Sequence, residues 1–178
     1  IVNKGEKIMF QLFTDTDTDI TPEIAKQFGY KLISMPYSIH GKDIYPYIDF
    51  DKFDYKEFYN ILREGEIPKT FALSPQAYVE YFEPTLKEGK DIVYVHFSGA
   101  MSGTFNSMNL AWQELKERYP ERKLYSIDTM GVSICSYNIA VEIAERANNG
   151  ATAEELVCWA EKEVDKFAVY FFADDLKF

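Results

Sequence analysis

Residues 92–108 read Ile-Val-Tyr-Val-His-Phe-Ser-Gly-Ala-Met-Ser-Gly-Thr-Phe-Asn-Ser-Met, and this stretch predicts a strand, a short loop and the start of a helix. Its first six residues form an almost continuous apolar and β-branched run, typical of a central strand covered on both faces. Small residues follow at 98–103. Beyond them, apolar side chains recur at spacings of three and four, as on one face of a helix: Phe105, Met108, Trp112, Leu115 and Tyr119. A buried strand that leads into a helix is the repeating unit of an α/β fold.

The loop at residues 98–103 has two interpretations. A strand-to-helix junction leaves backbone N–H groups unpaired at the positive end of the helix dipole, where an anion binds favourably, and Ser102 and Thr104 add hydroxyls there. However, Ser, Gly and Thr are common in any such connection, because they cap helices and tolerate unusual dihedrals. The sequence has no Lys after the glycines, as in a Walker A loop, and no Gly-x-Gly-x-x-Gly motif. These absences argue against a nucleoside triphosphate as the ligand.

The composition is that of a soluble, globular protein. Of the 178 residues, 47% are hydrophobic and 16% aromatic, which excludes disorder, and no apolar run approaches the roughly 20 residues of a membrane span. A formal net charge of −10 argues against nucleic acid, whose phosphates require a basic surface. Nothing at the start resembles a signal peptide, and Cys135 and Cys158 fall in expected helices, which suits reduced thiols. We therefore expect a cytoplasmic protein that is not inserted in a membrane.

The rest of the chain alternates strands with capped helices. Strands are expected at residues 9–13, 92–97, 123–127 and 168–173, and a hairpin at residues 31–38 and 42–47. Helix starts are marked by Thr21-Pro22, by Asp54, by Ser74-Pro75 and by a capping box of Thr152 and Glu155. This order predicts an α/β fold, a three-layer α/β/α domain with a mainly parallel sheet.

Three polar turns follow expected strands, at residues 14–19, 98–104 and 128–133. Ligands of such sheets bind at the carboxyl ends of the strands, so the turns are expected to meet at one edge, and Thr70 is expected to reach the same edge from its own loop. The first turn carries alternating aspartates, which suit a metal site, a nucleophile or simply a turn whose side chains bond the local backbone. The sequence leaves these three interpretations open.

One functional hypothesis is a phosphatase, because the pattern is similar in part to the haloacid-dehalogenase-type phosphohydrolases. Asp15 and Asp17 would act as nucleophile and acid/base. Ser98 would hold phosphate, and the aspartate pair at residues 174–175 would hold Mg²⁺. The match is incomplete, since Asp19 stands where that family has Thr or Val, and no Lys stands out before the late aspartate pair.

The second hypothesis is a resemblance over essentially the whole chain to the DegV family of bacterial fatty-acid-binding proteins. The matching pieces occur in the family's order: Thr14-Asp15-Thr16-Asp17-Thr18-Asp19-Ile20, Pro68-Lys69-Thr70 with Ser74-Pro75, residues 98–107, Asp128-Thr129 with Ser133, and residues 171–176. The Ser-Gly-Thr-aromatic-x-Ser piece at residues 102–107 is the most specific of these.

The resemblance implies that one long-chain fatty acid lies in a tunnel between two lobes, with its carboxylate held by Thr70 and Ser102. A supporting cradle is expected from Ser98, Gly103, Thr104 and Ser133. A carboxylate buried beside an acyl chain needs several donors, which hydroxyls and helix N–H groups supply. Family members present the acid to a fatty acid kinase, so we expect the kinase catalytic subunit as partner. The chain itself is expected to be non-catalytic, without metal or cofactor.

The sequence departs from the family pattern in two places. The loop that usually reads Thr-Ser-Gln-Pro-Ser is here Thr-Phe-Ala-Leu-Ser at residues 70–74, with an apolar middle. The sequence also stops where the family's Gly-Gly-Arg segment and second lobe begin. The resemblance thus predicts an N-terminal α/β domain at residues 1–165 and the first strand of a C-terminal lobe at residues 166–178. Because an apolar face is then uncovered, these 178 residues alone are expected to bind fatty acid weakly or not at all and to self-associate.

Overall fold

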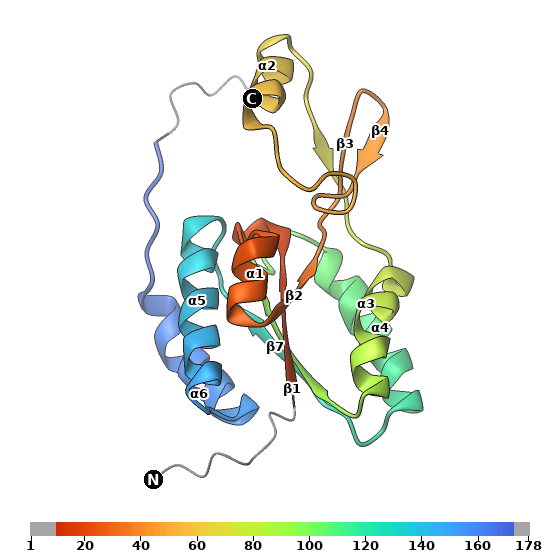
Figure 1. Cartoon of the computed structure of the whole chain (residues 1–178), viewed down its shortest axis with the longest axis vertical. Helices are drawn as coiled ribbons and strands as arrows, with labels where there is room; N and C mark the ends of the chain where they lie inside the picture. The colour runs from red at the N-terminus through yellow and green to blue at the C-terminus, as the bar shows by residue number, and fades with distance from the viewer. Residues whose placement is uncertain (1–9, 173–178) are drawn as a thin grey trace.

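The computed structural model describes residues 10–172 and contains a four-stranded parallel sheet, sheet A (Figure 1). Its strands lie in the order β2-β1-β6-β7, and every neighbouring pair is parallel. The bounds are Phe10–Asp15 for β1, Tyr30–Ile33 for β2, Asp91–His96 for β6 and Leu124–Asp128 for β7. The predicted α/β fold with a mainly parallel sheet is confirmed.

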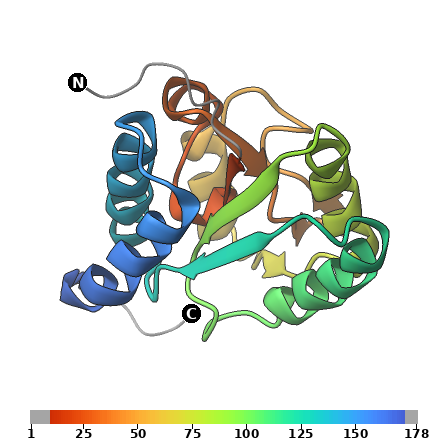
Figure 2. The ribbon, with the colours of Figure 1, turned by 90° about the horizontal axis from the view of Figure 1, so that it is seen from below.

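Helices cover both faces of sheet A and complete three layers (Figure 2). One face packs against α1 (Pro22–Phe28), α5 (Ile134–Asn148) and α6 (Ala153–Glu163). The other face packs against α3 (Pro75–Lys87) and α4 (Thr104–Arg118). Two separate cores result, because successive side chains of a strand point to opposite faces, so Leu12 belongs to the first core and Phe13 to the second.

The helix starts lie where the sequence places caps. Thr21 accepts a hydrogen bond from the Ile24 N–H at the start of α1, and Ser74 accepts one from the Ala77 N–H at the start of α3. Asp54 caps α2, which spans Tyr55–Arg63. At α6 the predicted capping box is complete: the Glu155 N–H donates to the Thr152 hydroxyl at 3.2 Å, and the Thr152 N–H donates to the Glu155 carboxylate at 2.8 Å. The short polar signals thus set the helix boundaries.

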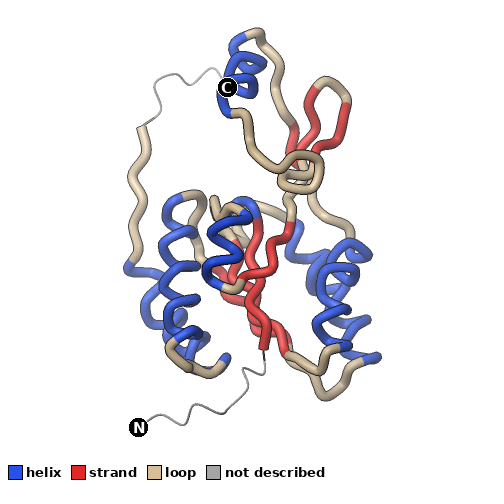
Figure 3. The backbone as a smooth tube through the Cα atoms, in the orientation of Figure 1, coloured by secondary structure: helices blue, strands red, loops and turns tan. Residues whose placement is uncertain are grey.

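A small subdomain stands above the carboxyl edge of sheet A (Figures 1 and 3). It contains α2 and a three-stranded antiparallel sheet in the order β4-β3-β5. The strands are β3 (Tyr37–Ile39), β4 (Lys42–Ile44) and the two-residue β5 (Lys69–Thr70). Aromatic side chains hold it together, with ring contacts that link Tyr37 to Phe58 and Phe53 to Phe58.

The predicted hairpin of residues 31–38 with residues 42–47 is wrong in its first half. Residues 30–33 form β2 of sheet A, parallel to β1, and only β3 pairs with β4. The break falls at a buried Ser34-Met35-Pro36 segment. Pro36 has no N–H to donate to a ladder, so one apolar run is divided between two sheets.

The predicted strand at residues 168–173 is also wrong over the residues that the structure describes. Residues 168–172 have no regular structure, and their side chains are exposed, from 39% at Val169 to 100% at Phe172. An apolar, aromatic run forms a strand only beside a partner, because its N–H and C=O groups must be paired. Residues 173–178 lie outside the described part, and the domain boundary at residue 165 stays a prediction. Between residues 10 and 172, no helix combines the length and apolar character needed to cross a membrane.

Candidate functional site

A cleft of about 710 Å³ lies at the carboxyl edge of sheet A and is lined in part by the small subdomain. All three turns predicted to meet at this edge contribute to its lining, with Thr16 from the first, Ser102 from the second and Ser133 from the third. The small subdomain contributes Tyr37 and Thr70. The cleft is therefore built from segments that lie far apart in the sequence, and its volume falls in the range of about 300–1,000 Å³ that is usual for small-molecule sites.

The lining is amphipathic. The apolar and aromatic part comprises Met35, Pro36, Tyr37, Pro46, Tyr47, Phe50, Phe53, Phe71, Ala72, Phe97, Met101 and Val132. The polar part comprises Thr16, Asp17, Asp19, Thr70, Ser102, Gly103, Thr104 and Ser133. Such a lining suits a ligand that has a long apolar body and a small polar head.

Thr70 and Ser102 lie in this one cleft although they come from different parts of the fold. Thr70 is opposite Tyr37 in the β3–β5 pair, whereas Ser102 precedes α4. The Thr70 hydroxyl makes no hydrogen bond to any of residues 10–172, and the Ser102 hydroxyl accepts the Thr104 N–H at 3.2 Å while its own proton has no acceptor there. Both hydroxyls are thus free to donate, and their role on a carboxylate stays a prediction.

The four residues expected to support the cradle lie in different places. Gly103 and Ser133 line the cleft, whereas Ser98 is buried and does not. Ser98 shapes the loop through its backbone, since its N–H donates to the Gly131 carbonyl at 2.7 Å and its carbonyl accepts the Met101 N–H at 3.1 Å. The structure thus offers only part of the expected set to a ligand.

Thr104 reaches the cleft but is mostly engaged inside the protein. Its side chain is buried, lies 3.0 Å from the Tyr78 hydroxyl and accepts the Leu73 N–H at 3.2 Å. Its own N–H donates to Ser102. Thr104 thus fixes the position of the Ser102 loop relative to α3 and to the segment that follows Thr70.

Ser133 joins the first turn to the third. Its φ of 51° is in the left-handed region, which is unfavourable for a residue with a side chain. Two contacts hold it there: its hydroxyl donates to the Asp19 carboxylate, and its N–H donates to the Asp17 carbonyl at 3.3 Å. These bonds place the two cleft aspartates beside the start of α5.

Asp15 lies inside the protein rather than in the cleft. Its carboxyl is completely buried and accepts hydrogen bonds from the Tyr94 hydroxyl at 3.0 Å, the Phe97 N–H at 3.3 Å and the Asp17 N–H at 3.1 Å. Burial, and next the nearby Asp17, raise the pKa of Asp15 well above its ordinary value. Asp15 therefore faces no space in which a substrate would sit, and the geometry gives the nucleophile of the phosphatase hypothesis no support.

Asp17 and Asp19 do line the cleft. Although the Asp17 side chain reaches solvent, protein atoms crowd it and remove part of its hydration. This desolvation, followed by repulsion from Asp19, raises the pKa of Asp17 to about 6. The aspartates at 174–175 that the phosphatase hypothesis assigned to Mg²⁺ lie outside the described residues.

Two glycines permit the close packing of the second and third turns. A Cβ at Gly99 would lie 2.8 Å from the Asp128 carboxylate, which accepts the Gly99 N–H at 3.1 Å. A Cβ at Gly131 would lie 2.7 Å from the Cys135 sulfur. Sequence reasoning missed these contacts and the buried Tyr78 and Tyr94 hydroxyls, because no local pattern distinguishes such residues from ordinary loop glycines and core tyrosines.

The chain matches a model of a protein family. The model described as "Uncharacterised protein, DegV family" matches residues 9–178. A DegV domain-containing protein of Clostridium perfringens is 32% identical over 167 residues, which are 94% of this chain and 57% of that protein. The chain thus spans about 57% of the length of this curated relative.

Solved structures have the same fold. A DegV family protein from Thermus thermophilus, described with fatty acid binding, aligns with a TM-score of 0.75 at 23% identity over 88% of this chain and 54% of its own. A stearic acid-binding protein from Eubacterium ventriosum aligns with a TM-score of 0.77 at 18% identity, over 86% and 52%. DegV of Bacillus subtilis, described as a fatty acid binding protein, aligns with a TM-score of 0.73 at 21% identity. The alignment covers 89% of this chain and 55% of that protein. At these identities the likeness establishes the fold.

Proposed function

This chain belongs to the DegV family, and from that premise we propose that its cleft binds a long-chain fatty acid, with the carboxylate on the hydroxyls of Thr70 and Ser102. Solved relatives from Thermus thermophilus, Eubacterium ventriosum and Bacillus subtilis are described as binding fatty acids. The amphipathic lining of the cleft supports the same class of ligand.

The observation that carries the proposal is that two hydroxyls from separate parts of the fold, each with a proton free to donate, line one amphipathic cleft. A carboxylate that leaves water must recover hydrogen bonds, and bonds from donors to a charged group are about twice as strong as neutral ones. The acyl chain gains roughly 0.8 kcal/mol for each buried CH₂ group, which the aromatic walls can supply. The cleft therefore offers hydrogen-bond donors to the carboxylate and apolar walls to the acyl chain.

We further propose that the chain is not itself an enzyme and presents its fatty acid to the catalytic subunit of a fatty acid kinase, which forms the acyl phosphate. Thr70 and Ser102 line a cleft that is open to solvent, so a partner could reach a carboxylate held there. The interior position of Asp15 supports a binding role over hydrolysis by this chain.

Mass spectrometry of an organic extract of the purified protein tests the ligand, and titration with a fluorescent fatty acid tests the site. Ser102→Ala and Thr70→Val each remove a donor to a charged group, which is worth about 1.5–3 kcal/mol, so each should weaken binding by about ten- to a hundredfold. Ser107→Ala on α4, which does not line the cleft, is the matched control. If both cleft variants bind like the parent, the site assignment is wrong.

The kinase step has its own assay. With ATP, Mg²⁺ and a purified fatty acid kinase catalytic subunit, the chain should support acyl phosphate formation, and Ser102→Ala should reduce it in proportion to its loss of bound fatty acid. Tight fatty acid binding without acyl phosphate formation would separate the two parts of the proposal and reject the second.

A further inference from the structure

The cleft carries negative charge without a compensating cation among residues 10–172. Asp17 and Asp19 are the carboxylates in its lining, and no Lys, Arg or His from residues 10–172 lines it. This arrangement is unusual for a site that is to hold an anion, because like charges that share a partly desolvated space repel each other strongly.

The two aspartates are not equivalent. The Asp19 carboxylate accepts a hydrogen bond from the Ser133 hydroxyl, which stabilises its charge. The Asp17 carboxylate accepts none from residues 10–172, whereas its backbone N–H and C=O are both hydrogen-bonded. Its N–H donates to the Asp15 carboxyl at 3.1 Å, and its carbonyl accepts the Ser133 N–H at 3.3 Å. Asp17 therefore stays at the cleft with no donor to its charge.

The titratable groups around Asp17 are acidic or neutral. From the surrounding elements these are Asp15 at the end of β1, Asp19 in the same turn, Tyr78 on α3, Cys135 on α5, and Tyr37 and Tyr47 from the small subdomain. Burial raises the pKa of the Cys135 thiol and of Tyr78, so these groups remain neutral near pH 7. Asp17, with its pKa raised to about 6, is the cleft group closest to taking up a proton at that pH.

We infer that a fatty acid carboxylate binds in this cleft together with a proton on Asp17, and that Asp19, which keeps its charge, then favours singly charged over doubly charged head groups. The inference rests on the proposed fatty acid binding and adds that this binding depends on pH through Asp17. The proton comes from solvent and converts Asp17 from a repelling charge into a hydroxyl donor. A dianionic head group, such as an alkyl phosphate, still faces Asp19 with its second charge and binds less well.

The test titrates three ligands of equal chain length, laurate, dodecyl phosphate and dodecanol, at pH 6, 7 and 8. Because the bound state holds the extra proton, laurate should bind about three- to tenfold more tightly to the parent chain at pH 6 than at pH 8. Uncharged dodecanol should show no such slope. Dodecyl phosphate should bind more weakly than laurate at pH 8, where it is a dianion.

Asp17→Asn should bind laurate at pH 8 about as well as the parent does at pH 6 and lose the slope, and it should still bind laurate more tightly than dodecyl phosphate because Asp19 is unchanged. Asp43→Asn on β4, an exposed aspartate that does not line the cleft, should keep the parent's slope. Calorimetry of laurate binding to the parent at pH 7, in two buffers of different ionisation enthalpy, measures proton uptake without any variant.

The outcomes separate the inference from the function on which it rests. Laurate binding that is independent of pH, no proton uptake, or an unchanged slope in Asp17→Asn overturns the inference and leaves fatty acid binding intact. If neither laurate nor dodecanol binds at any pH, the proposed function fails and the inference fails with it.

Discussion

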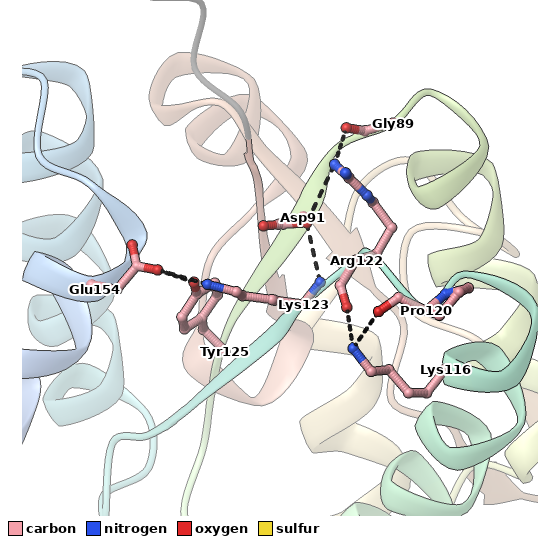
Figure 4. A network of polar contacts seen from close by, with 8 residues as sticks. All are labelled: Gly89, Asp91, Lys116, Pro120, Arg122, Lys123, Tyr125 and Glu154. Atoms are coloured by element: carbon pink, nitrogen blue, oxygen red, sulfur yellow. Dashed lines mark hydrogen bonds and ion pairs between the residues drawn. The ribbon is translucent and has the colours of Figure 1, made fainter.

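The two edges of sheet A differ in whether their polar groups have hydrogen-bond or ion-pair partners within the protein. At the amino edge, charged side chains are bonded to one another and to loop carbonyls (Figure 4). At the carboxyl edge, several polar groups of the cleft have no partner among residues 10–172, notably the Thr70 hydroxyl and the Asp17 carboxylate. Both edges are made from the ends of the same four strands. The difference shows where the fold is closed by its own residues and where groups remain available to a ligand.

The amino edge illustrates the closed case. Arg122 donates to the Gly89 carbonyl and lies 3.5 Å from the Asp91 carboxylate, which also accepts the Lys123 N–H at 3.1 Å. Lys116 donates to two carbonyls of the α4–β7 connection. These groups are partly or largely exposed, so each bond adds little to stability.

At the carboxyl edge, polar groups that line the cleft without a partner lie next to a network of buried hydrogen bonds. Asp15 bonds Tyr94, and Thr104 lies within hydrogen-bond distance of Tyr78, beneath the surface that carries Thr70 and Ser102. Buried polar groups are costly to leave unpaired, so this network should be more sensitive to substitution than the amino edge. Four substitutions test the comparison, from the largest expected effect to the smallest.

Asp15→Ala should have the largest effect. It removes the acceptor of the Tyr94 hydroxyl and of the N–H groups of Phe97 and Asp17. Each buried donor left unpaired costs about 1–3 kcal/mol, so we expect the free energy of unfolding in urea to fall by roughly 3 kcal/mol or more. Asp15→Asn keeps one oxygen as acceptor and should lose less than half as much. Equal losses in the two variants would show that Asp15 stabilises the edge by some other means.

Gly131→Ala should cause the next largest loss in the free energy of unfolding. The added Cβ would lie 2.7 Å from the Cys135 sulfur, and overpacking of this kind costs about 1–3 kcal/mol. Gly103→Ala is the matched control, because a Cβ there would meet no atom within 4 Å, and its free energy of unfolding should stay within about 0.5 kcal/mol of the parent. Thermal unfolding measures both, and a similar loss in the control would mean that packing at the third turn is not the cause.

The sequence predicted the parts of this architecture that depend on local patterns. The strand and helix of residues 92–108, and the caps at Thr21, Ser74 and Thr152, follow from hydrophobic spacing and from residues that bond their own neighbours. The meeting of Thr70 and Ser102 in one cleft followed from the family resemblance together with the parallel order of the sheet.

The sequence did not predict what depends on distant partners. Alternating Asp and Thr at residues 14–19 gives no signal for which carboxylate is buried, because that depends on Tyr94, 79 residues away. Pro36 is a local signal for dividing residues 31–38, but which sheet each half joins depends on β1 and β4, which lie elsewhere in the chain. Residues 168–172 have strand-forming side chains, but no strand of the described part pairs with them.

Asp17→Asn tests the open part of the carboxyl edge through the pH dependence of stability. The pKa of Asp17 in the folded chain, about 6, is above its ordinary 3.8, so the folded state holds this proton more tightly than the unfolded state. Stability from this group is therefore complete below about pH 4 and is lost as the pH rises through 6. The variant should be more stable than the parent at pH 8, by about 1 kcal/mol after solvent screening, and equal to it at pH 4. Melting temperatures across this range measure the effect, and the same gain in Asp43→Asn would contradict it.

Lys116→Met should have the smallest effect, although it removes two hydrogen bonds at once. The ammonium donates to the carbonyls of Pro120 at 2.7 Å and Arg122 at 3.0 Å, but the side chain is exposed and water can take its place at both carbonyls. Methionine keeps most of the apolar stem, so we expect a loss of only about 0.5–1 kcal/mol in urea denaturation. Lys162→Met on α6, a lysine without a hydrogen-bond or ion-pair partner in residues 10–172, is the control for removing a surface charge. A loss at Lys116 as large as that of Asp15→Ala would mean that the amino edge is as strongly coupled as the carboxyl edge. The contrast would then lie only in which groups a ligand can reach, and not in how the two edges are stabilised.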